Sequence, residues 1–168
     1  MNRSVTTRRL RLQPMRLEDA ENAIRILRHD RVKMTYMVPD LDREGANKLF
    51  LRLMELSVND AHYVRGIYLE NNLIGWINDT EIADSCVELG WVIDPNFHNR
   101  GIATEAVKAA IADLFGSGFR VVTAGAFAEN TASIRVMEKA GMQRVERQDQ
   151  IDYRGKSHLC VYYESRSE

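Results

Sequence analysis

The chain has 168 residues, 45% of them hydrophobic, and its 23 basic side chains nearly balance 24 acidic ones, for a formal net charge of -1. This size and apolar content predict one packed domain over residues 1–168 and exclude wholesale disorder. The balanced charge argues against a nucleic-acid partner, and no run reaches the roughly 20 apolar residues that a membrane helix needs, so we expect no membrane partner either.

Neither the N-terminal stretch nor the cysteines indicate secretion. Residues 1–11 are polar and basic without an apolar core, so we do not expect a secretory signal. Cys86 and Cys160 have no metal-ligand spacing, and the four histidines are scattered along the chain. This pattern predicts no metal site and a reducing, cytoplasmic location.

The first third of the chain combines one strand with two helices. Polar and apolar residues alternate over residues 6–13, which predicts the strand. Residues 29–43 have no clear period and contain Pro39, so we expect a loop there. The helices on either side of it are predicted by apolar residues at helical spacing, namely Ala20, Ala23, Ile24 and Leu27, then Ala46, Leu49, Phe50 and Leu53.

A strand-rich block follows. Residues 62–69 and 73–77 are predicted strands joined by a tight turn at Asn71-Asn72, since asparagine tolerates positive φ. Residues 86–93 are a further strand, which Pro95 and Asn96 end. The next helix is predicted by an apolar stripe that stops before Gly116 and Gly118, made of Ala103, Ala106, Val107, Ala110, Ile111, Leu114 and Phe115.

The last third predicts a strand over 121–127, a helix over 130–140 closed by Gly141, and two strands over 142–150 and 157–163 that turn near Arg154-Gly155. The strand–helix–strand unit from 86 to 127 is expected to be a right-handed parallel crossover. The fold class is therefore α/β, with a single mixed, mostly antiparallel sheet, a central parallel β-α-β crossover and helices on both faces.

The junction between the strand at 86–93 and the next helix is a candidate anion site. Backbone N–H groups at a helix N-terminus lack partners and attract phosphates. Gly101 and Ala103 leave room for phosphate oxygens, and Arg100 adds a charge. A glycine in an ordinary strand-to-helix turn is the alternative.

Four segments of the chain resemble those of a known family. His98-Asn-Arg-Gly-Ile-Ala103 resembles the Gln/Arg-x-x-Gly-x-Gly/Ala acyl-CoA loop of the GCN5-related N-acetyltransferases (GNAT). The segments Glu88-Leu-Gly-Trp-Val-Ile93 and Asn130-Thr-Ala-Ser-Ile-Arg-Val-Met-Glu-Lys-Ala-Gly-Met142, together with Thr7-Arg-Arg-Leu-Arg-Leu12, resemble the subgroup of ribosomal-protein N-acetyltransferases. The resemblance implies the acyl-CoA N-acyltransferase fold and acetyl-CoA as co-substrate.

The resemblance also implies roles for individual residues. Backbone groups of Trp91 and Ile93 would bond the pantetheine arm like an added strand, and Asn130 would bond the pantetheine or orient the loop, although a plain helix N-cap is the alternative. His98 stands where the family has Gln or Arg and can still donate one hydrogen bond. The backbone N–H groups that would hold the pyrophosphate belong to Asn99, Arg100, Gly101, Ile102, Ala103 and Thr104.

Glu88 is the candidate general base. On a strand over 86–93 it lies opposite the apolar face, beside Gly90, where it could take the proton that an ammonium must lose before attacking a thioester. A solvated strand face or a structural ion pair is an equal alternative. The oxyanion would be bound by a backbone N–H around 91–93, by analogy with the family, and Ser133 is the best-matching proton donor for the departing thiolate. Many relatives carry a tyrosine where Met137 stands, so the donor is open, with Tyr153 as a weaker candidate.

We therefore predict transfer of an acetyl group to a primary amine, either a protein N-terminus or a small molecule. The acceptor would lie between the two early helices and the final hairpin, where Met34, Tyr36, Met37 and Tyr153 could line it or simply pack. A non-catalytic acyl-CoA sensor is the alternative function. A homodimer is compatible with the resemblance, and nothing in the sequence matches a P-loop or a dinucleotide fingerprint.

Overall fold

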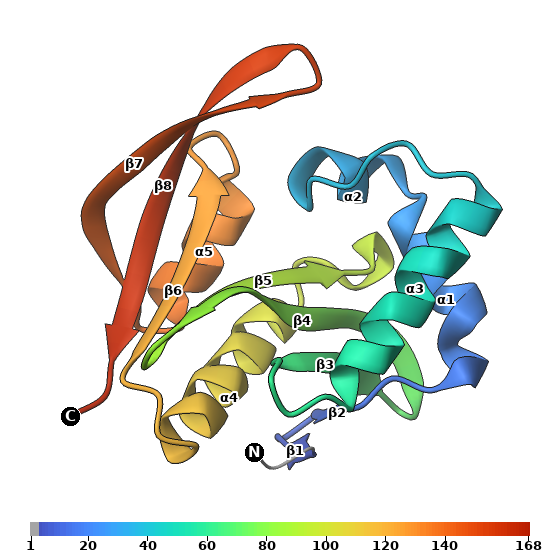
Figure 1. The fold of residues 1–168 in the computed structure, drawn as a ribbon, viewed down its shortest axis with the longest axis horizontal. Helices are drawn as coiled ribbons and strands as arrows, with labels where there is room; N and C mark the ends of the chain where they lie inside the picture. Colours follow the sequence, from blue (N-terminus) through green and yellow to red (C-terminus); the bar gives the residue numbers. More distant parts are fainter. Residues whose placement is uncertain (1–3) are drawn as a thin grey trace.

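The computed structural model describes residues 4–168 (Figure 1). Residues 1–3, the start of the stretch in which we expect no secretory signal, lie outside the described residues. Eight strands form one sheet in the order β1-β2-β3-β4-β5-β6-β8-β7. Their bounds are β1 Val5–Thr6, β2 Leu10–Gln13, β3 Val64–Leu69, β4 Asn72–Ala83, β5 Cys86–Ile93, β6 Val121–Phe127, β7 Gln143–Tyr153 and β8 Lys156–Arg166.

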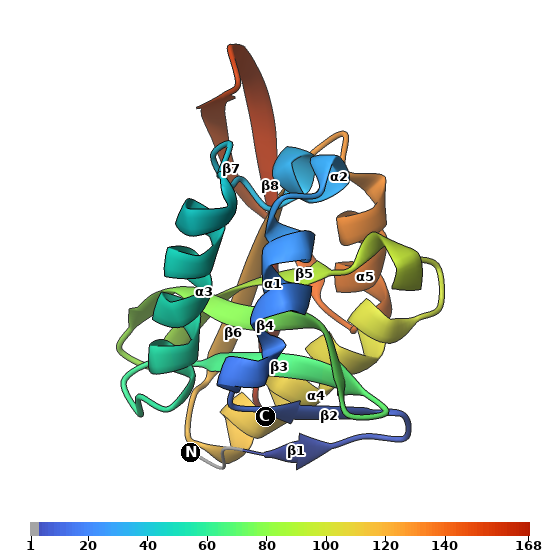
Figure 2. The ribbon, with the colours of Figure 1, turned by 90° about the vertical axis from the view of Figure 1, so that its right-hand side faces the viewer.

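Helices cover both faces of this sheet (Figures 1 and 2). On one face α1 and α3 pack in a core that includes Phe50 and Trp76. On the other face a second core joins α4 and α5 to the sheet through side chains such as Leu114 and Met137. The helices are α1 Ala20–Leu27, α2 Asp30–Thr35, α3 Arg43–Ser57, α4 Ile102–Gly116 and α5 Thr131–Lys139, with short 3-10 turns η1 Leu17–Asp19 and η2 Pro95–Phe97.

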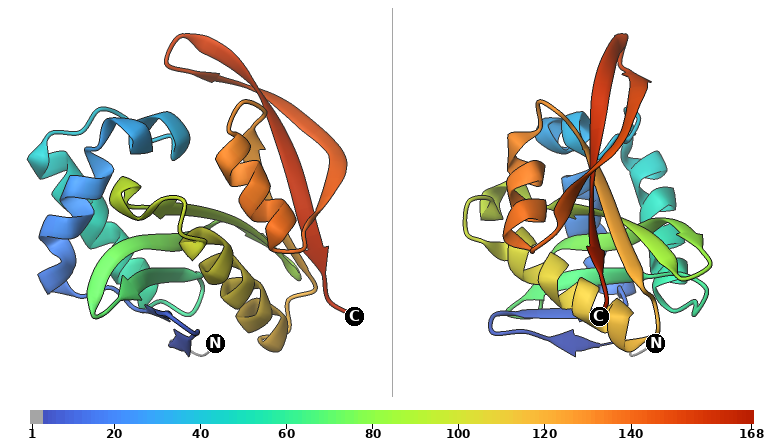
Figure 3. Two further views of the ribbon diagram at one scale, coloured as in Figure 1. Left: turned by 180° about the vertical axis from the view of Figure 1, so that it is seen from behind. Right: turned by 90° about the vertical axis from the view of Figure 1, so that its left-hand side faces the viewer.

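The predicted fold class is confirmed, including its one parallel strand pair. β5 runs parallel to β6, and every other strand pairing among residues 4–168 is antiparallel. The parallel pairing joins residues 86–89 to residues 121–124 and goes no further. Beyond it β5 continues beside β4 and β6 continues beside β8, so the sheet splits between its two central strands (Figures 1 and 3).

Three local predictions were wrong. The expected loop at 29–43 contains α2, a helix too short to show an apolar period, whose N-terminus is capped by the His29 side chain. The expected strand at 6–13 is a small hairpin, because the chain turns at Thr7, whose N–H bonds Leu10. The turn after β3 uses Glu70 and Asn71, both at positive φ, one residue earlier than expected.

The turn at Arg154-Gly155 is confirmed, since both residues have positive φ and the flanking Tyr153 and Lys156 pair. The hairpin of β7 and β8 extends well past the rest of the sheet (Figure 3). No helix among residues 4–168 is both long and apolar enough to cross a bilayer.

Candidate active site

A cavity of about 510 Å³ lies where β5 and β6 separate. The N-terminal turns of α4 and α5 and one side of α2 form its other walls. Ten of the twelve predicted site residues line it, while Arg100 and Glu88 do not. The ten are Trp91, Ile93, His98, Asn99, Gly101, Ile102, Ala103, Thr104, Asn130 and Ser133.

The end of β5 presents backbone groups to this gap. The N–H of Asp94 donates to the carbonyl of Ile74 on β4, at 2.7 Å. Backbone groups of successive strand residues point to opposite sides, so those of Ile93 and Trp91 point away from β4. They face the side from which β6 has diverged. This edge can accept an extended ligand as an additional strand, as we expect for a pantetheine arm.

Asp94 fixes the turn that leads from this edge to α4. Its buried carboxylate accepts from the N–H of Asn96 at 3.0 Å and from Nη2 of Arg25 on α1 at 2.7 Å. Burial alone would raise the pKa of Asp94, but the bonds from Arg25 and Asn96 outweigh burial and hold this pKa below its usual range. Pro95 then starts η2, where a missing N–H costs nothing.

The loop into α4 turns through two left-handed residues, Asn99 with φ 60° and Gly101 with φ 71°. Gly101 is the N-cap of α4, and among residues 4–168 the one atom within 4 Å of a Cβ built on it belongs to Arg9, at 3.6 Å. The first N–H groups of α4 have no partner within the helix and carry the positive end of its dipole. This geometry suits a pyrophosphate.

Arg9 and Glu105 hold this loop from outside the cavity. Arg9 donates to the carbonyl of Arg100 at 2.8 Å and forms an ion pair with Glu105 at 2.7 Å. Glu105 also accepts from the hydroxyl of Thr7. Burial tends to raise the pKa of Glu105, yet the bonds from Thr7 and Arg9 keep it low. The sequence did not predict this brace, because it joins residues that are far apart along the chain and share no local pattern.

His98 bonds the end of β5 rather than pointing freely into the cavity. Its Nε2 lies 2.9 Å from the carbonyl oxygen of Ile93, and since that oxygen can only accept, Nε2 carries the hydrogen. His98 therefore ties the loop back to the strand. The carbonyl of Ile93 keeps a second lone pair for a ligand.

The opposite wall of the cavity is the start of α5. Asn130 is its N-cap, accepting from the N–H of Ser133 at 3.2 Å, so the capping alternative is correct for its side-chain oxygen. Met137 is fully buried in the core and does not line the cavity. Arg135 and Lys139, one turn apart, do line it and add positive charge beside the α4 terminus. Their i, i+4 spacing places both cations on one face of α5, which the sequence alone could have indicated.

Glu88 lies on β5 but does not line the cavity. Its carboxylate forms an ion pair with Arg147 of β7 at 2.9 Å and accepts from the hydroxyl of Thr80 at 3.2 Å. The ion-pair alternative is thus present in the structure. It does not by itself remove Glu88 from the reaction, because the side chain is 20% exposed and lies three residues before the cavity-lining stretch of β5 that begins at Trp91.

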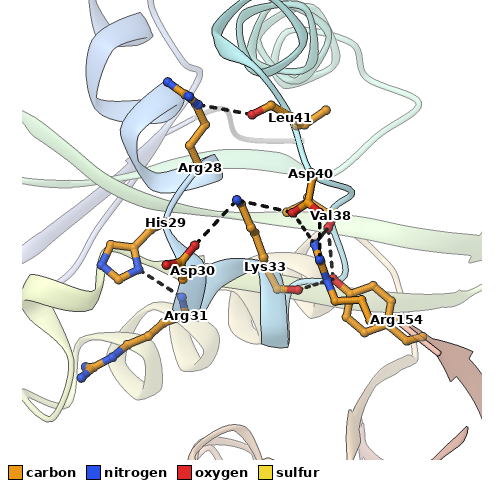
Figure 4. Close-up of polar contacts among 10 residues, drawn as sticks. Arg28, His29, Asp30, Arg31, Lys33, Val38, Asp40, Leu41 and Arg154 are labelled. Carbon is orange, nitrogen blue, oxygen red and sulfur yellow. Dashed lines mark hydrogen bonds and ion pairs between the residues drawn. The ribbon is translucent and has the colours of Figure 1, made fainter. Parts of the chain in front are cut away.

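The tip of the β7–β8 hairpin is fastened to the segment after α2 (Figure 4). Arg154 binds both carboxylate oxygens of Asp40, at 3.1 and 3.2 Å, and the carbonyl of Val38. Tyr153 Oη bonds the carbonyls of Lys33 and Val38, and Lys33 in turn pairs with Asp40. We call these contacts of Tyr153 and Arg154 the latch. The Tyr153 hydroxyl is engaged in it, and Tyr153 does not line the cavity.

The other proposed acceptor residues do not line the cavity either. Met34 and Met37 are exposed, and the Tyr36 hydroxyl belongs to an internal network with Asn78 and Trp76. Burial raises the pKa of Tyr36 to about 12. From α2, Val32 and Thr35 line the cavity instead.

Metal-ligand groupings were also sought. Across the described chain, residues 4–168, no three His, Cys, Asp or Glu side chains are placed to share a metal ion. Cys86 and Cys160 are free thiols, and burial raises the pKa of each.

Comparison with known proteins agrees with the architecture and motifs. A family model described as an acetyltransferase (GNAT) domain matches residues 9–143. The chain therefore belongs to the GNAT acetyltransferases, which confirms the family expected from the acyl-CoA loop and the α5 motif.

Two curated proteins of Bacillus subtilis (strain 168) are similar in part. The uncharacterized N-acetyltransferase YnaD is 41% identical over 58 residues, which is 34% of either chain. The N-acetyltransferase YjcK, which is named as probable, is 29% identical over 107 residues, 60% of this chain and 59% of its own. The chain thus spans less than two thirds of the length of each of these relatives.

Solved structures agree over nearly the whole chain. A GNAT-family acetyltransferase from Bacillus anthracis has a TM-score of 0.85 at 25% identity, covering 97% of this chain and 98% of that one. RimL, a ribosomal L7/L12 α-N-protein acetyltransferase in complex with coenzyme A, has a TM-score of 0.86 at 16% identity over 96% of each chain. At that lower identity the likeness is one of fold.

Proposed function

We propose that this protein transfers the acetyl group of acetyl-CoA to a primary amine. The observation that carries the proposal is the unpaired edge of β5 at Trp91 and Ile93, opening onto a cavity beside the N-termini of α4 and α5. An edge that accepts an extended arm next to a cradle of helix N–H groups fits pantetheine followed by a pyrophosphate. The cations of Arg135 and Lys139 suit the same phosphates.

Acetyl-CoA would supply the activated acetyl thioester, and the chain's own residues would bind it and move protons. Backbone groups of Trp91 and Ile93 would hold the arm, and the N–H groups of residues 99–104 would hold the pyrophosphate. Glu88 would accept a proton from the acceptor ammonium at a carboxylate oxygen, directly or through water. Ser133, at the cavity wall, would donate a proton toward the departing sulfur.

The acceptor would be a small-molecule amine or a protein N-terminus, entering below the latch between the hairpin tip and α2. RimL, which shares the fold, is a ribosomal L7/L12 α-N-protein acetyltransferase, and this motivates including an N-terminal peptide in any acceptor screen. We further propose a cytoplasmic location, in keeping with the two free thiols, and a homodimer on the strength of family resemblance alone.

The first test is calorimetric titration of the purified full chain with acetyl-CoA, with NADH as a control ligand. We expect micromolar binding, roughly -8 kcal/mol. Consumption of acetyl-CoA with any primary amine would then support the enzyme. Binding without consumption would favour the sensor, an alternative motivated by the burial of Met137 at the position where many relatives have tyrosine. No binding would overturn both.

A substitution at the α4 N-terminus tests the cradle. Gly101→Asp should weaken acetyl-CoA binding by more than about a hundredfold, roughly 2.7 kcal/mol, because a carboxylate would repel the pyrophosphate. Space around Gly101 accommodates a Cβ, but its φ of 71° strains any side chain there, so the control must carry the same kind of backbone strain. The matched control is Gly118→Asp, at φ 98° and at the other end of α4. Equal affinity in the two variants would exclude the loop from the site.

A further inference from the structure

Arg147 approaches Glu88 in a way that the proposed function does not explain. Arg147 is on β7 and Glu88 on β5, so two strands, β6 and β8, lie between them in the sheet. The guanidinium nevertheless reaches Oε2 of Glu88 at 2.9 Å. This contact spans the line along which the sheet splits.

Three local features allow this reach. First, β7 carries a bulge before Gln148: between the pairs Arg144 with Tyr163 and Gln148 with Val161, β7 advances four residues while β8 moves two. A bulge bends its strand and redirects a side chain. Arg147 lies in this bulge.

Second, the Tyr162 ring forms a platform under the guanidinium, with the Cζ atom of Arg147 3.7 Å from the ring centroid. The Tyr162 hydroxyl is held by Asp149 at 2.7 Å. Third, the platform lies flat on Gly125 of β6, where a Cβ would come within 2.7 Å of the ring. Any other residue at 125 would lift the platform that supports Arg147.

Stability alone is a poor reason for this arrangement. Arg147 is 49% exposed, and ion pairs exposed to that extent contribute little to folding. The carboxylate that it reaches belongs to the candidate general base, three residues before the cavity-lining stretch of β5 that begins at Trp91.

We propose that Arg147 is a positioning residue for the general base, fixing the carboxylate of Glu88 in place. This inference rests on the proposed function of Glu88. A base that is fixed in this way is oriented before the acceptor arrives.

Further side chains lie close to the carboxylate of Glu88. The hydroxyl of Thr80 donates to its other carboxylate oxygen. Other titratable side chains nearby include Glu81, its cross-strand partner on β4, Asp149, which also contacts Arg147, and the thiols of Cys86 and Cys160.

The test compares Arg147→Met, which keeps length and loses charge, with Arg147→Lys, which keeps the charge. Carbon-detected NMR on the full chain labelled at glutamate follows the titration of Glu88, and kcat/KM for acetyl transfer to spermidine and to a peptide with a free N-terminus is measured against pH. Arg147→Met should displace the acid limb of the profile and lower kcat/KM on it by about tenfold, because the guanidinium that holds Glu88 in place is gone. Lysine should restore part of the shift.

Arg52→Met, which removes a surface ion pair with Glu55 on α3, is the control and should change neither readout. If Glu88→Gln slows the reaction while Arg147→Met leaves midpoint and profile unchanged, the inference alone is overturned. If Glu88→Gln does not slow it, Glu88 is not the base and the proposed mechanism fails first. Equal shifts in Arg147→Met and Arg52→Met would also overturn the inference, since they would show a general effect of surface charge.

Discussion

Single side chains hold the candidate site together by joining segments far apart in the sequence. Asp94 joins β4, α1 and its own turn through three hydrogen bonds. Arg9 joins the N-terminal hairpin to the loop at Arg100. The sequence located that loop through its motif, but these braces depend on which distant residues meet, and no local pattern encodes that.

Asp94 should make stability depend on pH. Its pKa is lowered in the folded state, so its contribution is fully present above the unfolded value near about 3.9 and is lost as the pH falls through the lower folded value. Asp94→Asn should therefore lower the free energy of unfolding by about 1.5–3 kcal/mol at pH 7, and by less at pH 3. Urea denaturation at both pH values measures this.

The exposed Asp152→Asn is the matched control and should cost little at either pH. A deficit in Asp94→Asn that stays constant down to pH 3 would mean that Asp94 acts through shape rather than charge.

At the scale of elements, the apolar stripe of α4 and the strands around it were predicted within a few residues. The failures have a common cause, which is that short elements carry too few residues for a period. α2 has six residues and one buried side chain, Val32, so only its His29 cap could have revealed it. The cavity wall that α2 forms was missed for the same reason.

The β7–β8 hairpin should open when its latch is removed. Tyr153→Phe deletes the hydroxyl that bonds the carbonyls of Lys33 and Val38. We expect a net loss of about 1 kcal/mol in the free energy that keeps the hairpin tip closed. Amide hydrogen exchange at residues 150–158 and 33–40 should therefore speed up by about fivefold, while the affinity for acetyl-CoA is preserved. Unchanged exchange in these segments would show that the contacts between Arg154 and Asp40 are enough to hold the hairpin tip closed.

For the whole molecule, the order of elements and the parallel crossover led from sequence to the correct fold class, because connection length and handedness restrict the topologies. Only the family resemblance, which implies an added-strand role for Trp91 and Ile93, indicated that β5 separates from β6. Both strands read as ordinary apolar strands, and how far they stay paired depends on how the two halves of the sheet twist apart.

Binding at the split should stabilise the entire fold. A ligand that binds only the folded state adds about 2.7 kcal/mol to the free energy of unfolding at a concentration of 100 Kd. Acetyl-CoA should therefore raise the urea midpoint of the wild type and leave that of Gly101→Asp unchanged. Stabilisation of both proteins to the same degree would place the binding elsewhere.

The short parallel pairing has a mechanical consequence. Residues 86–89 and 121–124 form the seam through which the sheet's two halves are hydrogen-bonded, with α4 and α5 bridging them on one face. Because this seam is short, we expect it to bend, so that the half of the sheet that carries β6, β8 and β7 can tilt against the half that carries β1 to β5. The Arg147–Glu88 ion pair and the hydrogen bonds of Tyr153 then connect the two halves at two places, one near the seam and one at the hairpin tip.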